Sequence, residues 1–539
     1  MHDDITGVRF TGAVYTPQIV AAALVSHLEP LLGVEPLDIL EPSVGDGSFL
    51  RAIHNVRKED RLTLVDIDAG VIDRLRQETS LDADSRVTFR TGDFLVYASE
   101  LMRSGQQYFD LIIGNPPFIR AHNFSSNLKS AVADLAEVTG YDKSELKNSW
   151  AAFLAASSKL VSKTGILAFV LPYELITVAY GQKALSRLVE RFKRVDIYVS
   201  RAKAFPEIDQ DALIVIAQKV PKEPHGLYIN RVSSLHELER QAVPSLDIDV
   251  GSDRSLALNS FLLTADSLGL LRKLRAKCQR LEVYAGSAPG IVSAANSFFI
   301  LTQSEVERRG FDKVVVPILK KGSFASSQPV FAKADFDMLR EREPAFLLSL
   351  KGQKDQLPVN IQKYIAEGEE ALLHLRYKCR NRANWYEVPM VKPELGFVFK
   401  RAHSYPRLCV NEAGVFLTDT AYGLRIKEGY TIRGLTFSFY NSMTMLFAEI
   451  DGRFYGGGVL ELSPTEFRGL PIAYHEPTDE EYAAFLSVHG EARGRVEPIL
   501  DFGDTWLASK LRLSIHEIRS LRRSWIDVRN HRLRHSGRN

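Results

Sequence analysis

The sequence lacks the features expected of a secreted, metal-stabilised or membrane-spanning protein. Its 539 residues include only three cysteines, Cys278, Cys379 and Cys409, which lie far apart. Their odd number and spacing exclude a disulfide framework and fit no zinc motif, so no metal site is predicted. No apolar run reaches the roughly 18 residues needed to span a membrane, and residues 1–4 include two acids and begin no apolar leader. We therefore expect a cytoplasmic protein that does not bind membranes.

Short apolar runs alternate with helical patterns over the first 220 residues. This alternation is typical of a parallel β-sheet covered by helices on both faces. Only 11 residues, 201–211, separate the last two runs, which is short for a helical crossover, so this pair is expected to be antiparallel. The prediction is an α/β domain with a seven-stranded, mostly parallel sheet and a reversed strand at its end. The expected strands are residues 37–40, 62–66, 87–90, 110–114, 165–171, 195–200 and 212–219.

The pattern weakens after about residue 220. Several prolines and a glycine between residues 221 and 251 predict a linker. The stretch that follows is richer in glycine, aromatic residues and short β-like runs, and the chain from about Asp479 is helical and charged. The predicted organisation is an α/β domain at 1–240, a linker with a helical connection at 241–280, a mixed α+β domain at 281–475 and a basic helical segment at 476–539.

A glycine-containing turn follows the first expected strand, in the sequence Glu41-Pro42-Ser43-Val44-Gly45-Asp46-Gly47. Gly45 and Gly47 permit a tight strand-to-helix turn whose backbone a ligand can approach. Leu50 stands where a dinucleotide fingerprint has its third glycine, so that fingerprint is incomplete. The carboxylates of Glu41 and Asp46 repel phosphate and suit a ligand that carries a cationic amine and a sulfonium. Taken alone, the segment is also compatible with a plain tight turn.

Acidic residues also stand at the ends of the next two expected strands. Asp66 lies 21 residues after Gly45, a spacing at which an acidic residue can accept hydrogen bonds from both hydroxyls of a ribose. Asp93 can accept from an adenine amino group, with Phe94 beside the ring. Each aspartate can equally be a helix cap or a turn residue. Three acidic strand ends in succession favour a ligand site, because ligands of such sheets bind outside the carboxyl ends of the strands.

The most specific pattern is Asn115-Pro116-Pro117-Phe118, which directly follows the apolar fourth strand. Each proline fixes its own φ and restricts the residue before it, so the backbone is rigid. The side-chain oxygen of Asn115 and the carbonyl of Pro116 can each accept a hydrogen bond from one NH₂ group. These acceptors draw a planar amine toward tetrahedral geometry and localise its lone pair for attack, while Phe118 offers a face to a planar ring. A proline-stiffened turn is the less favoured alternative.

Together with Ala13-Val14-Tyr15-Thr16-Pro17, these motifs resemble those of the gamma-class DNA adenine-N6 methyltransferases of type II restriction–modification systems. The motifs also occur in the order of that class, with a Tyr-x-Pro-like element first and a long C-terminal region last. The resemblance spans about residues 10–220. It implies a Rossmann-like, S-adenosylmethionine-dependent methyltransferase domain followed by a target-recognition domain. The cofactor-binding residues that it implies are Thr16, Glu41, Gly45, Gly47, Asp66, Ile67, Asp93 and Phe94.

The same resemblance implies catalysis on a base that has been extruded from the duplex. Asn115, Pro116, Pro117 and Phe118 are then the catalytic residues, and Phe205, in the loop between the last two strands, stacks on the flipped adenine. From the sequence alone, a locally packed phenylalanine is an equal interpretation of Phe205. Residues 150–153, on the helix after the tetrapeptide, can line the same site, although a core face is their favoured interpretation.

The net charge of +2 hides an uneven distribution of basic residues. Residues 371–410 hold eight Lys or Arg and two acids, with aromatic residues interleaved. Such a pattern supplies contacts to phosphates and bases, so duplex DNA is the predicted partner. Segments 288–299 and 377–386 also resemble target-recognition segments of related type II enzymes. The residues expected to contact DNA are Arg380, Arg382, Trp385, Lys400 and Arg401.

A second basic stretch ends the chain. Residues 505–539 hold nine Lys or Arg and two acids. The pair Arg522-Arg523 and the segment 529–534 predict a basic helix near phosphate, and a disordered tail is expected beyond about Arg534.

Three functions are compatible with these patterns. The favoured one is methylation of adenine N6 in duplex DNA by the modification component of a restriction–modification system, with a cognate endonuclease encoded separately. No Pro-Asp followed by Glu-x-Lys was found, so a fused nuclease is not expected. A DNA specificity subunit with an inert methyltransferase fold is the second, and intact Asn115–Phe118 and Asp66 argue against it. The third is methylation of RNA or of a protein glutamine amide, and the long basic C-terminal half favours DNA over both.

Overall fold

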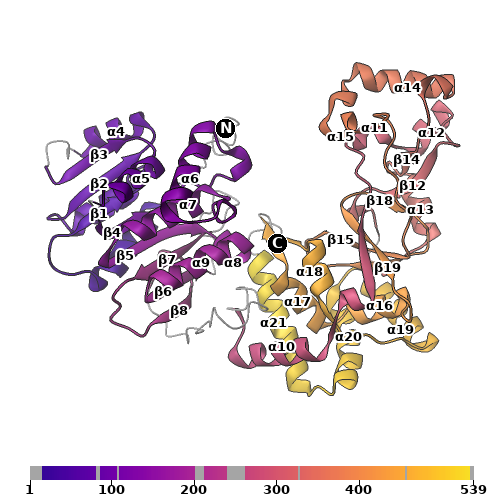
Figure 1. Ribbon diagram of the computed structural model, residues 1–539. Helices are drawn as coiled ribbons and strands as arrows, with labels where there is room; N and C mark the ends of the chain where they lie inside the picture. Colours follow the sequence, from indigo (N-terminus) through magenta and orange to yellow (C-terminus); the bar gives the residue numbers. More distant parts are fainter. Residues whose placement is uncertain are drawn as a thin grey trace. The chain divides into compact units, whose positions relative to one another are not determined.

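The computed structural model describes residues 15–79, 85–105, 108–200, 212–238, 262–325, 328–455 and 458–533. The chain divides into two compact units between Phe261 and Leu262 (Figure 1). The second unit includes helix α10 (Ala265–Lys277) and the C-terminal helices as well as the mixed region. The finer boundaries at 240, 280 and 475 stay predictions. None of the helices in the described ranges is long and apolar enough to cross a membrane.

A mostly parallel sheet forms the centre of the first unit (Figure 1). Its strands are β1 (Asp38–Glu41), β2 (Arg61–Asp66), β3 (Val87–Thr91), β4 (Phe109–Gly114), β5 (Val161–Pro172), β6 (Arg194–Ser200), β7 (Ala212–Gln218) and β8 (Gly226–Val232). They lie in the order β3-β2-β1-β4-β5-β7-β6-β8. Chain order reverses between β1 and β4, and ligands of open α/β sheets bind at such a switch point, outside the carboxyl ends of the strands.

Helices cover both faces of this sheet. They are α2 (Gln18–Leu28), α3 (Ser48–Val56), α4 (Ala69–Thr79), α5 (Phe94–Ser104), α6 (Ser126–Thr139), α7 (Ser149–Leu160), α8 (Glu174–Thr177) and α9 (Ala179–Arg191). Apolar residues of α2, α3 and α4 pack in one cluster with alternate strand residues such as Ile39 and Leu64. The intervening residues, such as Leu40 and Ile112, are equally buried, as expected for strands whose apolar runs are nearly continuous.

The sheet confirms the predicted α/β fold and the antiparallel pairing of β6 with β7. Two details of the prediction are corrected. β7 lies between β5 and β6 rather than at the end of the sheet, and β8 adds an eighth strand that runs parallel to β6. Prolines 221 and 224 predicted a linker, but they form the short connection that leads into β8.

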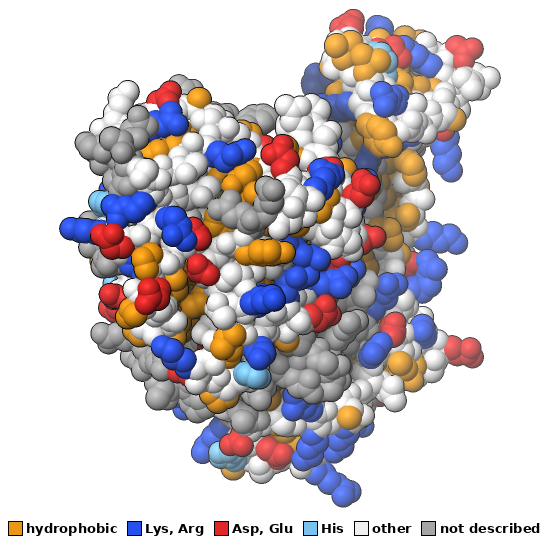
Figure 2. Space-filling model, turned by 60° about the vertical axis from the view of Figure 1, so that its left-hand side comes forward, with side chains coloured by type: hydrophobic (Ala, Val, Ile, Leu, Met, Phe, Trp, Pro, Cys, Tyr) orange, Lys and Arg blue, Asp and Glu red, His pale blue; other side chains and the backbone are white. Residues whose placement is uncertain are grey.

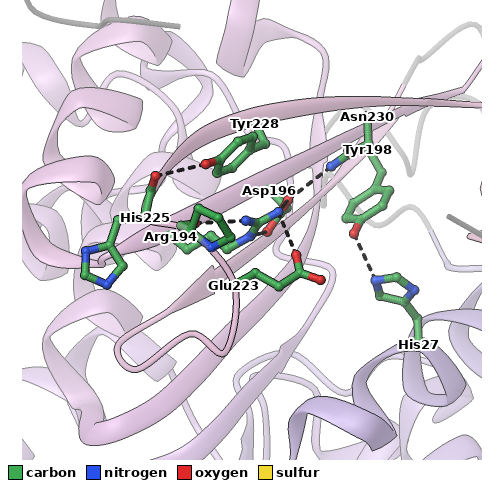
Figure 3. Close-up of polar contacts among 9 residues, drawn as sticks. His27, Arg194, Asp196, Tyr198, Glu223, His225, Tyr228 and Asn230 are labelled. Carbon is green, nitrogen blue, oxygen red and sulfur yellow. Dashed lines mark hydrogen bonds and ion pairs between the residues drawn. The ribbon is translucent and has the colours of Figure 1, made fainter. Parts of the chain in front are cut away.

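A buried arginine fixes this connection (Figure 3). The Arg194 guanidinium donates two hydrogen bonds to Asp196, of 2.7 and 2.9 Å, and one of 2.9 Å to the Pro224 carbonyl. It also forms an ion pair with Glu223 at 3.0 Å and lies 4.0 Å from the centre of the Tyr228 ring. Every one of these groups comes from β6, β8 or the turn between β7 and β8. The cluster therefore holds the edge strand at the amino end of β6, opposite the edge where ligands are expected.

Several small sheets and many helices make up the second unit. The strands are β9 (Gln279–Arg280), β10 (Ala285–Pro289), β11 (Ile300–Leu301), β12 (Val315–Leu319), β13 (Val330–Phe331), β14 (Phe346–Leu348), β15 (Gly396–Phe399), β16 (Arg401–Ala402), β17 (Leu408–Asn411), β18 (Phe416–Leu417), β19 (Ala421–Ile426), β20 (Arg453–Tyr455), β21 (Val459–Glu461) and β22 (Pro471–Ile472). The largest sheet has the order β10-β19-β15-β17-β13, and the next β11-β14-β12-β18. This architecture confirms the predicted mixed α+β class.

The helices of the second unit lie between these strands and after them. They are α10, α11 (Asn296–Phe299), α12 (Gln303–Arg309), α13 (Lys333–Arg340), α14 (Val359–Glu370), α15 (Tyr377–Arg380), α16 (Ile432–Phe439), α17 (Ser442–Asp451), α18 (Pro464–Gly469), α19 (Asp479–Ala492), α20 (Val496–Leu511) and α21 (Ile515–Leu533). The last three confirm the helical character predicted from Asp479 onward.

Candidate active site and nucleic-acid surface

The turn between β1 and α3 depends on both of its glycines. Gly45 and Gly47 have φ values of +54° and +81°, which side-chain-bearing residues rarely adopt. A Cβ atom on Gly45 would lie 3.2 Å from the Tyr15 ring, and one on Gly47 would lie 2.6 Å from Cδ2 of Leu75. The turn is thus packed beneath Tyr15. Asp46 accepts a hydrogen bond of 3.1 Å from the amide of Ser48, so its carboxylate serves the start of α3.

The two aspartates that follow β2 have different roles. Asp66 accepts a hydrogen bond of 2.9 Å from the amide of Gly45 and another of 3.0 Å from the amide of Asp68. Asp68 accepts from the amide of Gly70 at 2.8 Å, so Asp68 is the residue that stabilises the start of α4. Asp66 instead joins the end of β2 to the glycine turn. Ile67 between them is 73% exposed, and its side chain is accessible to a flat ligand.

The end of β3 supports only part of the predicted adenine site. Asp93 is the N-cap of α5 and accepts a hydrogen bond of 2.8 Å from the amide of Leu95, which is the plainer of its two interpretations. Phe94 is 2% exposed, and its ring centre lies 5.0 Å from that of Phe153. In this structure Phe94 belongs to the core, whereas Ile67 is accessible. Contact of Asp93 and Phe94 with a cofactor stays a prediction.

Glu41, the last residue of β1, is a buried acid without a partner. Its side chain belongs to a residue that is 1% exposed, and neither carboxylate oxygen accepts a hydrogen bond within the described part of the chain. Burial, followed by the charges of Asp46 and Asp66, raises the pKa of Glu41 well above its ordinary value. The Oγ1 of Thr16, which is 4% exposed, also has no hydrogen-bond partner among the described residues. A buried, unpaired carboxylate is costly unless a cation or a donor completes it.

The tetrapeptide lies beside this carboxylate. A Cβ atom on Gly114 would lie 3.4 Å from Cδ of Pro42 and 3.8 Å from Cγ of Glu41, so the ends of β4 and β1 are in contact. The Ser43 hydroxyl donates to the carbonyl of Asn115 at 3.0 Å. The structure therefore brings together the predicted catalytic Asn115 and the predicted cofactor turn at the switch point of the sheet. Pro116 is buried, and Pro117 and Phe118 are partly buried.

The chain beyond Phe118 is held by the start of α7. The Ser149 hydroxyl donates to the carbonyl of Pro117, and it accepts from the amide of Ile119 at 2.8 Å. The amide of Ser149 in turn donates to the carbonyl of Ile119 at 2.8 Å. Three hydrogen bonds thus fix the backbone on both sides of Phe118. Trp150 and Phe153 of the same helix are 0% and 7% exposed, as expected for the core face that was their favoured interpretation.

The tail predicted beyond about Arg534 lies outside the described residues, as do two elements predicted at the active site. These two elements are Phe205, in the segment 201–211, and the first two residues of Ala13–Pro17. Stacking of Phe205 on a target base therefore stays a prediction.

The two segments that resemble recognition elements meet in the second unit. Arg376 donates to the carbonyl of Ala294 at 3.0 Å, and Arg382 donates to the carbonyls of Val292 and Ser293, each at 3.0 Å. Trp385 donates its indole N–H to Glu369 at 3.3 Å and packs against Phe298, with ring centres 5.5 Å apart. Arg382 and Trp385 therefore make contacts inside the protein that join these two segments. A direct contact of either residue with DNA stays a prediction.

The other predicted DNA contacts are more accessible. Arg380 is exposed and lies 5.3 Å from the centre of the Tyr377 ring, which is itself 70% exposed. Lys400 lies 4.9 Å from the Tyr422 ring, and exposed Arg401 forms an ion pair with Glu461 at 2.6 Å. Basic side chains gather in patches on the face drawn in Figure 2. Contact of Arg380, Lys400 and Arg401 with DNA stays a prediction.

The C-terminal helix is basic as predicted, but two of its arginines act inside the fold. Arg522 donates to Asp504 at 2.8 Å and to the Ser442 hydroxyl at 2.7 Å. The side chains of Arg532 and Glu449 are both fully buried and form two hydrogen bonds of 2.7 Å. The expectation that these two arginines lie near phosphate is therefore wrong, because carboxylates of the chain already pair with them.

Sequence reasoning missed the residues that support the tetrapeptide. Ser43 and Ser149 hold its carbonyls, and Glu174 pairs with Arg120 just beyond it. Serines and glutamates carry no pattern by which their partners, up to 72 residues away, can be inferred. Only the position of Ser43, directly after Glu41-Pro42, pointed to this edge of the sheet.

Known families match most of the chain. Residues 54–202 match the family described as Eco57I restriction-modification methylase, and residues 257–507 match the C-terminal domain of type II methyltransferase M.Eco57I. Type II methyltransferase M.AccI of Acinetobacter calcoaceticus is 22% identical over 477 residues, which cover 84% of this chain and 83% of the relative. M.XamI of Xanthomonas campestris pv. amaranthicola is 22% identical over 86% of this chain and 85% of its own length.

A solved structure shares the fold over much of the chain. The cryo-electron microscopy structure of the DrdV–DNA complex superposes with a TM-score of 0.50 and 12% identity, over 90% of this chain and 58% of DrdV. At that identity the likeness concerns the fold alone.

The sheet, its switch point and the buried acid beside Asn115 define an S-adenosylmethionine-dependent methyltransferase. The two family matches and the relatives support a type II restriction–modification methyltransferase that acts on DNA.

Proposed function

We propose that this enzyme transfers a methyl group to N6 of an adenine that has been extruded from duplex DNA. The observation that carries the proposal is the placement of Asn115–Phe118 at the end of β4, in contact with the end of β1 where Glu41 is buried without a partner. A side-chain amide oxygen next to a proline carbonyl suits an exocyclic amine, which has two N–H groups to donate. An aromatic face beside them suits a planar base.

The residues present fit S-adenosylmethionine, which supplies an electrophilic methyl group on a sulfonium. Glu41 and Thr16 are a buried acceptor and a buried hydroxyl for which the described residues supply no hydrogen-bond partner, and they suit the cationic end of this ligand. Asp66, tied to the amide of Gly45, is placed to accept from ribose hydroxyls, with exposed Ile67 beside the adenine ring. Gly45 and Gly47 form the tight turn that carries this site, and Asp93 and Phe94, at the start of α5, complete the proposed set.

The chain's own contribution to the reaction lies in positioning and hydrogen bonding. Asn115 and the Pro116 carbonyl accept hydrogen bonds from the two N–H groups of the amine and so turn the nitrogen lone pair toward the methyl group. These bonds strengthen as the amine becomes tetrahedral, and they therefore act on the transition state rather than on binding. The N–CH₃ bond forms as the S–CH₃ bond breaks, and the nitrogen then releases one proton to solvent. Ser43 and Ser149 hold the carbonyls of Asn115 and Pro117, on either side of Pro116, and Phe118, with Phe205 as its proposed counterpart, sandwiches the base.

The test is to express the chain in cells without DNA methylation and to map every modified base by sequencing. N6-methyladenine in one short sequence context is the expected result. Asn115→Ala should reduce the turnover number at least roughly 100-fold, as loss of an oxyanion-type contact does, while binding of cofactor and DNA largely survives. Asn123→Ala, an exposed residue eight positions on, is the control. Near-normal turnover by Asn115→Ala, or methyl groups on cytosine, would refute the assignment.

We also propose that the cognate endonuclease is a separate protein. The methyltransferase should then protect DNA from an endonuclease that cleaves the mapped sequence. Cleavage of DNA that is fully methylated at the mapped site would contradict this pairing.

A further inference from the structure

Arg120 lies two residues beyond the tetrapeptide, at the same edge of the sheet as Asn115. Its side chain is 56% exposed, and Nη2 donates to Oε1 of Glu174 at 3.1 Å. A guanidinium has five N–H donors in a planar fork, and one carboxylate oxygen occupies only part of it. Arg120 can therefore bind a second anion while it stays paired with Glu174.

Glu174 is fixed more firmly than an acid of an ordinary surface ion pair. It stands directly after β5, and its Oε2 accepts from the Tyr180 hydroxyl and, at 3.4 Å, from Nδ2 of Asn148. Burial, with the nearby charge of Glu174, raises the pKa of Tyr180 and so favours the protonated hydroxyl that donates to Glu174. Two donors from separate parts of the chain thus orient one carboxylate, and that carboxylate orients Arg120.

The backbone around Arg120 is equally constrained. Residues 119–121 pair with residues 147–149, through Ile119 with Ser149 and through the amide of Ala121, which donates to the Lys147 carbonyl at 2.9 Å. Lys147 is exposed, so the backbone pairing brings a second basic residue to this part of the chain. The edge around Asn115 therefore has two kinds of charge: carboxylates at the glycine turn, and accessible cations beyond Phe118.

We propose that Arg120 binds a backbone phosphate that flanks the target nucleotide and that Glu174 is its positioning residue. The inference rests on the proposed function, because an extruded base carries its own sugar and phosphates to this edge of the sheet. A phosphate is repelled by Glu41, Asp46 and Asp66 but attracted by Arg120 and Lys147. The oriented guanidinium thus determines which way the nucleotide enters, with its base at Asn115 and its backbone on the opposite side from the cofactor.

The experiment uses a duplex with the mapped recognition sequence, in which the phosphate on the 5′ or the 3′ side of the target is replaced by a neutral methylphosphonate. Arg120→Ala should lower kcat/KM for DNA roughly tenfold to a hundredfold and should reduce the salt dependence of binding by about one counterion. The neutral phosphate should cost the wild-type enzyme a similar factor on one side of the target and cost Arg120→Ala nothing further. Additive losses on both sides would overturn the proposal.

Arg61→Ala is the matched control. Arg61 is 57% exposed and pairs with Asp38 at 2.6 Å, but it begins β2 and so lies at the opposite edge of the sheet. Its loss should leave both kcat/KM and the methylphosphonate effect unchanged. An equal loss in Arg61→Ala would mean that general surface charge, not a local contact, explains the result.

Glu174→Gln separates positioning from folding. The amide oxygen can still accept from Tyr180, but the charge that orients Arg120 is gone. KM for DNA should rise and the methylphosphonate effect should shrink, while the dissociation constant for S-adenosylmethionine and the melting temperature stay at wild-type values. A lower melting temperature with an unchanged methylphosphonate effect would make Glu174 merely structural. If the mapped base is not adenine, the proposed function fails, whereas this comparison can still be made at the base that is methylated.

Discussion

Two buried glutamates, one in each unit, differ in what completes them. Glu449 is fully buried, and Arg532 pairs with both of its oxygens at 2.7 Å. Glu41 is 1% exposed, and no group in the described part of the chain pairs with either of its oxygens. Arg532 also donates to the carbonyls of His403 and Gly458, so the whole pair is saturated. The first glutamate is completed by the fold, whereas we propose that a ligand completes the second.

The difference separates structural charge from functional charge. Transferring a charge from water to the protein interior costs several kcal/mol. For a carboxylate, the protein offsets this cost with an oppositely charged partner or by protonation, which neutralises the group. Glu449 follows the first course. Glu41 has no such partner among the described residues, and burial raises its pKa well above the ordinary value, which favours the protonated form. A cationic ligand at this site would pair with Glu41 and favour its ionised form.

The largest effect is expected from Arg532→Ala. This substitution leaves Glu449 buried and unpaired, which should lower the free energy of unfolding by about 3–5 kcal/mol. Denaturant titration of the full chain measures it. Replacing both members, as Arg532→Met with Glu449→Leu, should recover much of the loss because no lone charge remains. A single substitution that costs no more than the double one would show that the pair is not coupled.

Glu41→Gln should weaken ligand binding and leave stability intact, whereas Arg532→Ala should lower stability. The amide removes the charge that attracts a sulfonium and an amine, so the affinity for S-adenosylmethionine should fall by about 1.5–3 kcal/mol, as measured by calorimetry. Folding should not suffer, because the wild-type acid has no partner to lose. A variant that binds the cofactor normally but unfolds more easily would reverse the assignment of the two glutamates.

The pH dependence at Glu41 follows from the sign of its shift. Since its pKa is raised on folding, the folded ligand-free enzyme holds a proton that the unfolded chain has released, and stability falls as pH rises above the ordinary glutamate value near 4.5. Glu41→Gln should remove this decline. Cofactor binding favours the carboxylate, so the wild-type affinity should increase with pH over the same range.

His489 is another buried titratable group, and it shows whether burial without a hydrogen-bond partner is enough to indicate a ligand site. It is 1% exposed, neither ring nitrogen has a hydrogen-bond partner among the described residues, and the centres of the Tyr440 and Phe485 rings lie 4.7 and 4.4 Å away. Burial lowers the pKa of His489 to about 3. Its surroundings are aromatic and uncharged, which suits a neutral ring and no ligand.

A stability measurement across pH distinguishes His489 from Glu41. The folded protein keeps His489 neutral, whereas the unfolded chain takes up a proton below pH 6.5, so stability should fall as pH decreases from 6.5 toward 3. At pH 5 the contribution is about 2 kcal/mol. His489→Phe should flatten this part of the profile. An unchanged profile would mean that other groups determine acid stability.

The sequence predicted strand ends well and side-chain partners poorly. Apolar runs locate the seven predicted strands because burial on both faces leaves a nearly continuous signal, and the site residues lie at strand ends by the same rule. The eighth strand was missed because Pro221 and Pro224 resemble a linker, while the arginine that fixes it, Arg194, acts through tertiary contacts. Phe94 and Ile67 are both apolar residues beside an acid, and only packing reveals which of them is accessible.

Charge patterns have the same limit in the second unit. Arg380 and Arg382 stand two residues apart in one basic cluster and were given the same predicted role. In the fold, Arg380 is exposed, whereas Arg382 bonds three carbonyls, and burial lowers its pKa. A sequence cannot show whether an arginine meets a phosphate or a carbonyl, because both are anionic or partly anionic oxygens.

The smallest effect is therefore expected at this pair. Arg380→Ala should weaken DNA binding by about 1 kcal/mol, reduce the salt dependence of binding by about one counterion and leave the melting temperature unchanged, since only a phosphate contact is lost. Arg382→Ala should instead lower the melting temperature, because the carbonyls of Val292 and Ser293 lose their donor, and its effect on affinity should vary little with salt. Binding at two salt concentrations, with thermal denaturation of both variants, separates the outcomes. The opposite result would be a change of salt dependence in Arg382→Ala and a lower melting temperature in Arg380→Ala. It would mean that Arg382, which bonds carbonyls inside the fold, is also the arginine that contacts DNA.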